Sequence, residues 1–99
     1  MSRAESQLAT LGLTLETLTP DLARQYEVDV RKGVLITGVN DGSLAALSNL
    51  QAGDVIVEAD HKPVSSVEEL QSALSKDKDQ VLLLVTRKSG NLFLVFRLK

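Results

Sequence analysis

Alternating apolar residues mark the first strand that the sequence predicts. Within residues 10–15 (TLGLTL), every second position is a leucine, and a period of two places these side chains on one face of an extended chain. The three positions are Leu11, Leu13 and Leu15. Gly12 lies among them, and because it lacks a Cβ the backbone there can bend sharply or let a second backbone come close. The pattern predicts a strand that runs to about Thr17.

Three later segments combine apolar residues at helical spacing with a capping signal. In each, a serine or threonine oxygen can accept a hydrogen bond from the first turn of the helix. Thr19 precedes a short helix that is predicted to begin at Pro20 and to end before Val28. The other two predicted helices are Leu44 to Ser48, capped by Ser43, and Val67 to about Ser75, where Ser66 and Glu69 fit a capping box.

Further apolar segments predict strands. β-Branched residues dominate 34–39 and 55–57, which is typical of strands. Residues 80–87 and 92–98 are apolar on both faces, so we expect these two strands to sit centrally in a small sandwich or barrel, joined by a hairpin turn at 88–91. The resulting order β-α-β-α-β-α-β-β predicts one α+β domain.

Composition excludes several classes of function. The chain has 99 residues and a formal net charge of −2, so no electrostatic field would gather nucleic acid or an anionic membrane. It has no cysteine for a disulfide or a thiolate metal site, and its longest apolar run, 81–85, is too short to cross a bilayer. We expect a flexible polar lead-in at 1–7 and a domain at 8–99, with no nucleic-acid partner and no membrane insertion.

Candidate catalytic groups are sparse. His61 is the only histidine, and its place in the predicted tight turn with Asp60 favours an exposed surface group over a catalytic base. The sequence supplies neither the orienting group nor the oxyanion site that a serine triad needs, and one histidine with scattered carboxylates makes no metal site. We therefore expect no catalytic residue, no metal and no cofactor. Asp54, after Gly53, is interpreted as a turn residue that accepts a local hydrogen bond.

Two motifs resemble the core of PDZ domains. GSLAA at 42–46, followed by LQAGDVI at 50–56, is similar to the "GSPAA…GLxxGDVI" pattern of that family, and EADHKPV at 58–64 resembles its "xxNGxPV" segment. The resemblance covers about residues 8–99. The "LGLTL…LTP" opening and the final hairpin look most like PDZ domains of the bacterial HtrA/Do (Deg) family of serine proteases, and most like the second, C-terminal PDZ.

Four positions depart from the family pattern. Leu44 stands where the family has a proline, and Asn49 stands where it has a glycine. Both are tolerable, because a serine cap works without the proline and asparagine accepts the left-handed conformation. Asp60-His61 replaces Asn-Gly and makes the tight turn less easy to form. These departures affect stability and leave the expected groove unchanged.

The resemblance implies a fold and a mechanism. The fold would be a PDZ-like small β-sandwich or partly open barrel of five to six strands and two to three helices, in the bacterial permuted topology. An extended peptide would add to a strand edge by β-augmentation, and backbone N–H groups would hold its carboxylate. The carboxylate would be bound at Leu11, Gly12 and Leu13, and the peptide groove would be formed by Thr14, Leu15, Val67, Gln71 and Leu74.

These residues also have purely structural interpretations. The leucines at 11, 13 and 15 could be core residues of a strand, Gly12 could mark a bulge, and Gln71 could be solvated helix surface. The resemblance favours the groove role for the first two leucines and favours it less for the third. Val67 cannot hydrogen-bond a hydroxyl, so the groove role predicts an apolar preference, or little discrimination, at the peptide position it faces.

The resemblance further implies a peptide-binding PDZ module of a periplasmic HtrA-type serine protease and chaperone, whose catalytic domain lies outside this chain. Its partners would be peptide C-termini or unfolded segments, with the protease domain or other PDZ domains of the same assembly. A first alternative is a PDZ with a covered groove that mediates oligomer or interdomain contacts, which the doubly apolar segment 92–98 favours. A second is a PDZ of another envelope protein, such as a secretion component or an intramembrane protease. A third, an autonomous hydrolase, is disfavoured by the missing triad.

Overall fold

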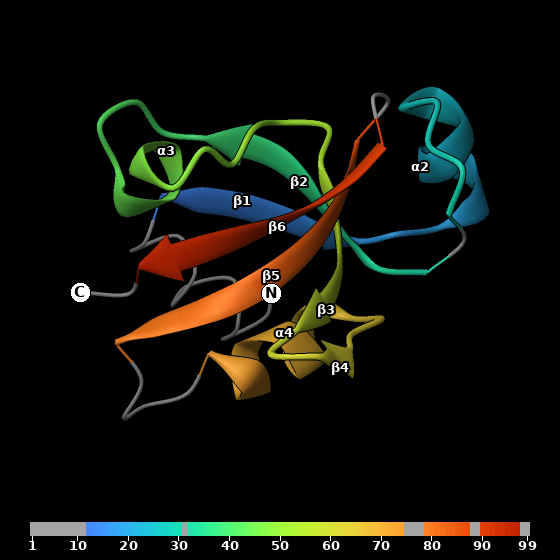
Figure 1. Cartoon of the computed structure of the whole chain (residues 1–99). Coiled ribbons are helices and arrows are strands. Elements are labelled where there is room, and N and C mark those ends of the chain that lie inside the picture. The colour runs from blue at the N-terminus through green and yellow to red at the C-terminus, as the bar shows by residue number, and fades with distance from the viewer. Residues whose placement is uncertain (1–11, 31, 75–78, 88–89, 98–99) are drawn as a thin grey trace.

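Six strands and three helices follow one another in the order that Figure 1 shows. The computed structural model describes residues 12–30, 32–74, 79–87 and 90–97, so the predicted lead-in at 1–7 lies outside the described residues. The strands are β1 Leu13–Thr17, β2 Val34–Val39, β3 Val55–Ala59, β4 Lys62–Pro63, β5 Gln80–Arg87 and β6 Gly90–Arg97. The helices are α2 Pro20–Gln25, α3 Leu44–Leu47 and α4 Val67–Ala73. The predicted order is confirmed, with β4 added because a two-residue strand leaves no periodic pattern.

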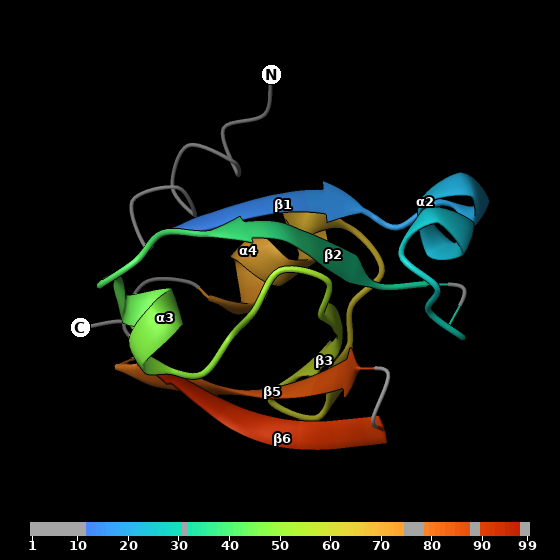
Figure 2. The ribbon, with the colours of Figure 1, turned by 90° about the horizontal axis from the view of Figure 1, so that it is seen from above.

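The strands form one antiparallel sheet in the order β1-β2-β3-β5-β6, with β4 paired to β3. Register shifts between Thr14 and Leu15 and between Ile56 and Glu58 bend the sheet. Figure 2 shows the result: β1 and β2 lie on one side of the molecule, and β5 and β6 lie on the other. Among the described strands β1 and β6 are the two ends, so the sheet is open and not closed into a barrel.

The predicted central position of the last strand is wrong. β6 lies at an end of the sheet and pairs only with β5 among the described strands. Phe96 is fully buried, whereas Phe93 and Val95 on the opposite face are 55% and 45% exposed. Apolar residues on both faces usually indicate burial on both faces, but here nothing in the described part of the chain covers the outer one.

The predicted capping residues of all three helices are confirmed. Thr19 Oγ1 accepts a hydrogen bond from the Leu22 N–H at 3.1 Å, and α2 ends before Val28 as predicted. Ser43 Oγ accepts from the Ala46 N–H at 3.1 Å, and Asn49 follows α3 with a left-handed φ of 69°. The caps form because each side-chain oxygen replaces an intrahelical partner that the first turn lacks.

The turn between β3 and β4 uses two left-handed residues. Asp60 and His61 have φ values of 51° and 69°, which is the conformation that a tight two-residue hairpin needs. Asp60 compensates for the strain by bonding to β5: its N–H donates to the Leu82 carbonyl at 2.7 Å, and its Oδ1 accepts from the Leu82 N–H at 3.0 Å. The turn is therefore held by the neighbouring strand as well as by its own backbone.

Buried apolar side chains form two clusters on opposite faces of the sheet. The larger cluster lies between the curved sheet and α4 and includes Phe96, Leu70 and Ile36. The smaller one consists of Leu18, Leu35 and Val55, and α2 covers it with side chains such as Leu22 and Tyr26. α2 therefore protects one part of the outer face of the sheet, and it lies at the opposite end of the molecule from α3 in Figure 2.

A buried ion pair joins the turn before β3 to the end of β5. Asp54 is 3% exposed; its Oδ1 lies 2.8 Å from Arg87 Nε and its Oδ2 lies 2.9 Å from Arg87 Nη2. Arg87 Nη2 also donates to the Asn49 carbonyl. Asp54 Oδ2 accepts from the Gln51 N–H at 3.0 Å, which confirms the predicted local hydrogen bond. The pairing with Arg87 is the part that the sequence did not predict.

Removing this carboxylate should be costly. We expect Asp54→Ala to lower the free energy of unfolding by about 3 kcal/mol, because it leaves the Arg87 guanidinium without its bidentate partner in a largely buried place. The matched control is Asp21→Ala, since the Asp21–Arg24 pair is exposed and should contribute less than about 1 kcal/mol. Urea unfolding of both variants measures the difference, and equal losses would contradict the importance of the buried pair.

Candidate functional site

The turn at Gly12 fits tightly against the loop that precedes α3. Gly12 has a φ of +95°, and its carbonyl accepts a hydrogen bond from the Asn40 N–H at 2.9 Å. A Cβ on Gly12 would lie 2.2 Å from the Ser43 Cβ, so no other residue fits without a backbone shift. Ser43 Oγ in turn donates to the Asn40 carbonyl at 2.7 Å. The glycine is therefore required both by its conformation and by the space around it.

The edge of β1 that faces away from β2 presents backbone hydrogen-bonding groups. Leu15 pairs with Ile36, but the N–H and the carbonyl of Ile36 bond to the Gly53–Asp54 turn on the other side. The N–H and carbonyl of Leu15 must therefore point away from β2. The Leu18 N–H donates to the Gly33 carbonyl and so points to the β2 side of the strand. Because successive N–H groups of a strand point to alternate edges, the N–H groups of Thr17 and Leu15 both point away from β2.

Helix α4 lies beside this edge. It packs against β1, and the Val67 N–H donates to Thr17 Oγ1 at 3.2 Å, across the space between the start of the helix and the end of the strand. We call this hydrogen bond the Thr17–Val67 bridge. β-Augmentation requires a strand edge like the outward edge of β1, with which no described strand pairs, and a backbone turn at the start of the strand is where a carboxylate can be captured.

The structure brings most of the predicted site residues together. Four of the apolar ones, which are 2–6% exposed, belong to the larger core cluster: Leu13, Leu15, Val67 and Leu74. Gln71 is half-buried on α4, and the Thr14 side chain is exposed on the other face of β1. Leu11 lies outside the described residues. The assigned apolar side chains thus pack in the core, which is the structural interpretation, and their contact with a peptide stays a prediction.

The first turn of α4 differs in one respect from the predicted capping box. Ser66 Oγ accepts from the Glu69 N–H at 3.1 Å, as predicted. The Glu69 carboxylate, however, accepts from the N–H and the hydroxyl of Ser65, at 2.7 and 3.0 Å, and not from the Ser66 N–H as a full capping box would have it. The predicted cap by Ser66 is therefore confirmed, whereas the return hydrogen bond to the Glu69 carboxylate comes from Ser65.

These hydrogen bonds make the helix start sensitive to acid. The backbone hydrogen bond from Ser65, then that from its hydroxyl, and last the charge of Lys32 lower the pKa of Glu69. Because the pKa is lower in the folded state than in the unfolded state, the stabilisation is present above the unfolded-state pKa. It is lost as the pH falls through the folded-state pKa.

A cavity of about 550 Å³ lies away from the predicted groove and contains none of the predicted site residues. It is formed by the end of α2, the turn before β3 and the end of β5. Its lining residues are Gln25, Tyr26, Glu27, Gln51, Ala52, Gly53, Asp54 and Arg87. The polar lining is largely occupied in internal contacts, since the buried ion pair of Asp54 and Arg87 forms one wall.

Sequence reasoning missed two contacts that shape the site. The sequence indicates Ser43 only as a helix cap, because its packing against Gly12 depends on how two distant loops meet. It indicates Thr17 only as the end of a strand, whereas in the structure the Thr17 hydroxyl accepts a hydrogen bond from the Val67 N–H, 50 residues later. A threonine at the end of a strand is the signal available in the sequence, but it does not identify the helix N–H group to which the hydroxyl bonds.

The described residues include neither a cluster of metal ligands nor a helix that could span a membrane. No group of three or more histidine, cysteine, aspartate or glutamate side chains is placed to hold a metal ion in the described part of the chain. No helix within the same residues is long and apolar enough to cross a membrane.

Comparison with known families identifies the fold. A family model described as the PDZ domain matches residues 9–94. The chain belongs to the PDZ domain family. This confirms the resemblance carried by the GSLAA and AGDVI motifs. The glycine turn, the outward edge of β1 and α4 are therefore parts of a PDZ fold.

Relatives of this PDZ domain include DegP-like and HTRA4 serine proteases. Serine protease HTRA4 of Mus musculus is 36% identical over 98 residues, which cover 93% of this chain and 20% of that protein. A probable DegP-like periplasmic serine endoprotease of Chlamydia pneumoniae is 33% identical over 81 residues, covering 81% of this chain and 17% of that protein. The chain thus spans a fifth or less of these relatives. The relationship to HtrA proteases is confirmed, and the assignment to their second PDZ stays a prediction.

Solved structures agree. The PDZ domain of HtrA3 in complex with a phage-derived ligand superposes with a TM-score of 0.76 at 28% identity, covering 88% of this chain and 81% of that chain. The HtrA-type protease AlgW with a decapeptide gives a TM-score of 0.76 at 25% identity, covering 88% of this chain and 27% of that one. Both neighbours were solved with peptides. The predicted PDZ-like α+β fold is confirmed.

The tight fit at Gly12 can be tested by substitution. We expect Gly12→Ala to lower the free energy of unfolding by about 3 kcal/mol, because it combines the cost of a left-handed φ with a collision against Ser43. Gly42→Ala is the matched control: Gly42 has a φ of +75° but nothing within 4 Å of an added Cβ, so about 1–2 kcal/mol is expected. Chemical denaturation compares them, and a loss at Gly12 no larger than at Gly42 would refute the packing argument.

Proposed function

We propose that this PDZ domain captures the C-termini of polypeptides, or extended apolar segments, by adding them as a strand to the edge of β1. The observation that carries the proposal is the outward direction of the Leu15 backbone groups on a strand at the end of the sheet, with α4 alongside. A peptide running antiparallel to β1 would bring its carboxylate to the turn at Leu11, Gly12 and Leu13. Two similar structures, the HtrA3 PDZ domain bound to a phage-derived ligand and the HtrA-type protease AlgW with a decapeptide, support peptide binding.

The proposed recognition of the peptide is mainly apolar. Val67 and Leu74 lie on the helix beside β1, and with Leu13 and Leu15 they offer hydrocarbon surface to the side chains of a bound peptide. These four side chains are almost fully buried without a ligand, so binding would require α4 to move slightly away from β1. Gln71 and Thr14 would complete the groove. The domain carries out no catalysis in this proposal.

The proposed context is that of the relatives. The parent protein would be a periplasmic HtrA-type serine endopeptidase with chaperone activity, and the domain would present unfolded segments to a catalytic domain on another part of the chain. Named relatives that are described as periplasmic serine endoproteases support this setting. The protease domain or other PDZ domains of the same assembly would be additional partners.

Amidation of a peptide's C-terminus tests carboxylate capture. We expect an amidated peptide ending in an apolar residue to bind at least about tenfold more weakly than its free-acid counterpart, a loss of about 1.4 kcal/mol or more, because charge-assisted hydrogen bonds are removed. Isothermal titration of both forms of one peptide measures the ratio. Equal affinity for the two forms would exclude capture at the Gly12 turn.

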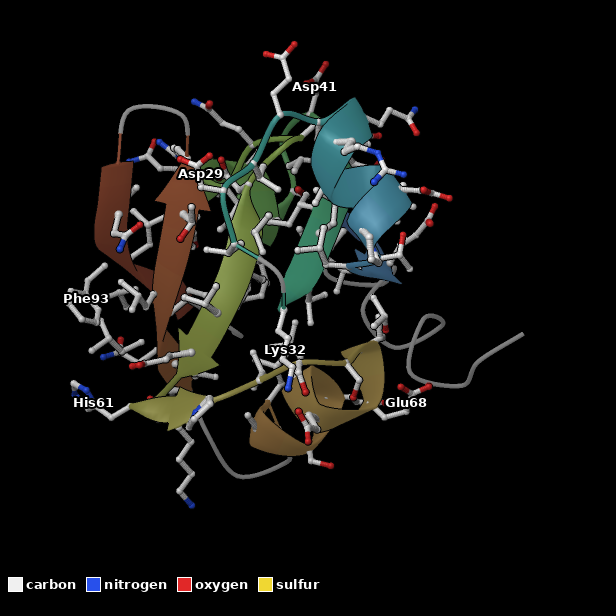
Figure 3. The ribbon with its side chains drawn as sticks, turned by 90° about the vertical axis from the view of Figure 1, so that its right-hand side faces the viewer. Asp29, Lys32, Asp41, His61, Glu68 and Phe93 are labelled. Carbon is white, nitrogen blue, oxygen red and sulfur yellow. The ribbon has the colours of Figure 1, made fainter. Side chains whose placement is uncertain are left out.

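A second function, assembly, is favoured by the outer face of β6. Phe93 and Val95 are exposed there, and the His61 ring lies 6.1 Å from the Phe93 ring at an interplanar angle of 54°. Figure 3 shows His61 and Phe93 at the same margin of the molecule. An exposed apolar surface of this kind is typical of a protein–protein contact. The role would be to hold neighbouring domains or subunits together.

Sedimentation equilibrium tests the assembly role. If β6 mediates self-assembly, the isolated domain should associate reversibly, and Phe93→Ser should shift it to monomer because the largest exposed apolar side chain of this surface is removed. Leu47→Ser is the control, since Leu47 is a 76% exposed apolar residue on α3. A monomeric wild type, or the same response to both substitutions, would exclude self-assembly through this face.

A further inference from the structure

We infer that Thr17 limits how many peptide residues the groove can read, because the Thr17–Val67 bridge closes the groove at the end opposite to Gly12. The inference rests on the proposed peptide binding at β1. In that mode the carboxylate lies at Gly12, and the peptide runs along β1 towards Thr17, antiparallel to the strand. Each earlier residue of the peptide therefore lies closer to the bridge.

The bridge holds the start of α4 close to the end of β1. The Val67 N–H and Thr17 Oγ1 are 3.2 Å apart, so the start of α4 is in hydrogen-bond contact with the end of β1. An added strand would lie about 4.7–4.9 Å from β1, and it would need further space on the side that faces α4. A peptide that reaches Thr17 must therefore leave the groove, even though the Thr17 backbone groups point towards its path.

The lengths of the two walls give the number of residues that fit. α4 has seven residues and at 1.5 Å per residue is about 10 Å long. An extended peptide advances about 3.3 Å per residue, so the helix flanks about three peptide residues. β1 has five residues, the last of which is Thr17, and so offers partners for about four. The length of α4 and the length of β1 therefore both predict that three to four C-terminal residues of the peptide are recognised.

Breaking the bridge would be energetically unfavourable in the free domain. The Val67 N–H belongs to the first turn of α4 and has no acceptor within the helix, while Ser66 caps only the Glu69 N–H. Thr17 supplies the missing acceptor, and Val67 itself is 4% exposed. Separating the two groups would leave a partly buried donor unsatisfied, which typically costs about 1–3 kcal/mol.

The groups beyond the bridge differ in character from the groove. Lys32 lies close enough to Glu69 to lower its pKa, and Figure 3 shows Lys32 pointing towards α4. Lys32, Glu68 and Glu69 are all exposed. A peptide that continued past the bridge would therefore meet solvated charges of both signs and not the apolar surface formed by β1 and α4.

The test measures affinity against peptide length. The probes are N-acetylated free-acid peptides of three, four, six and eight residues that share one C-terminal sequence ending in valine. We expect the wild-type affinity to rise up to four residues and then to stay within about twofold. Thr17→Ser, which keeps the hydroxyl, should show the same plateau. Thr17→Ala, which removes the acceptor and opens the end of the groove, should bind the eight-residue peptide at least about threefold more tightly than the four-residue one.

A measurement without peptide checks that the variant acts on the bridge. Hydrogen exchange of the Val67 amide should be faster in Thr17→Ala and unchanged in Thr17→Ser. A plateau in Thr17→Ala like that of the wild type would overturn the inference, as would a wild-type affinity that keeps rising to eight residues. Both outcomes leave peptide binding intact. A wild type that binds no peptide of any length would instead remove the proposed function, and this inference with it.

Discussion

The position of β1 depends on the packing of Gly12 against Ser43. The left-handed turn at Gly12 brings the chain to the loop before α3, where Asn40 bonds to its carbonyl and the Ser43 side chain occupies the space a Cβ would need. Ser43 also starts α3, so one side chain fixes a helix and a turn at once. If the turn moved, the start of β1 would move with it. The contact therefore anchors the start of the outward edge, whose direction is set by the pairing of β1 with β2.

The residues beside that edge have two roles that compete. Leu13, Leu15, Val67 and Leu74 fill the core of a small domain, and they are also the side chains closest to where a peptide would lie. Burying them stabilises the free protein, but a ligand can contact them only if the helix yields. Capture therefore depends on how firmly α4 is held on β1.

Local chemistry explains which parts of this structure the sequence predicts. Thr19, Ser43 and Ser66 cap helices within three residues of themselves, and Asn49 ends α3 in the conformation its type favours. Such features follow from neighbours in the chain. The PDZ fold, by contrast, is expected from the resemblance of the GSLAA and LQAGDVI segments to the family pattern.

The features that the sequence did not predict depend on contacts between distant segments. Asp54 has the turn position that its neighbours dictate, but its pairing with Arg87 requires knowing that the end of β5 lies beside that turn. Glu69 has two serines within reach, and the preference for Ser65 is settled by the path of the chain before α4. The doubly apolar β6 favours a central strand, because a pattern of apolar residues alone does not tell a covered face from an exposed one.

The near-sequential strand order also has a consequence for folding kinetics. Neighbouring strands in the sheet are mostly neighbours in the chain, and the longest connection between two paired strands of the main order, that from β3 to β5, has 20 residues. The contact between Thr17 and Val67 joins residues 50 positions apart, a longer loop than any other hydrogen bond described above. We therefore expect the docking of α4 on β1 to be a late step of folding. The proposed binding groove would be built from the part of the domain whose closure is least favoured by the order of the chain.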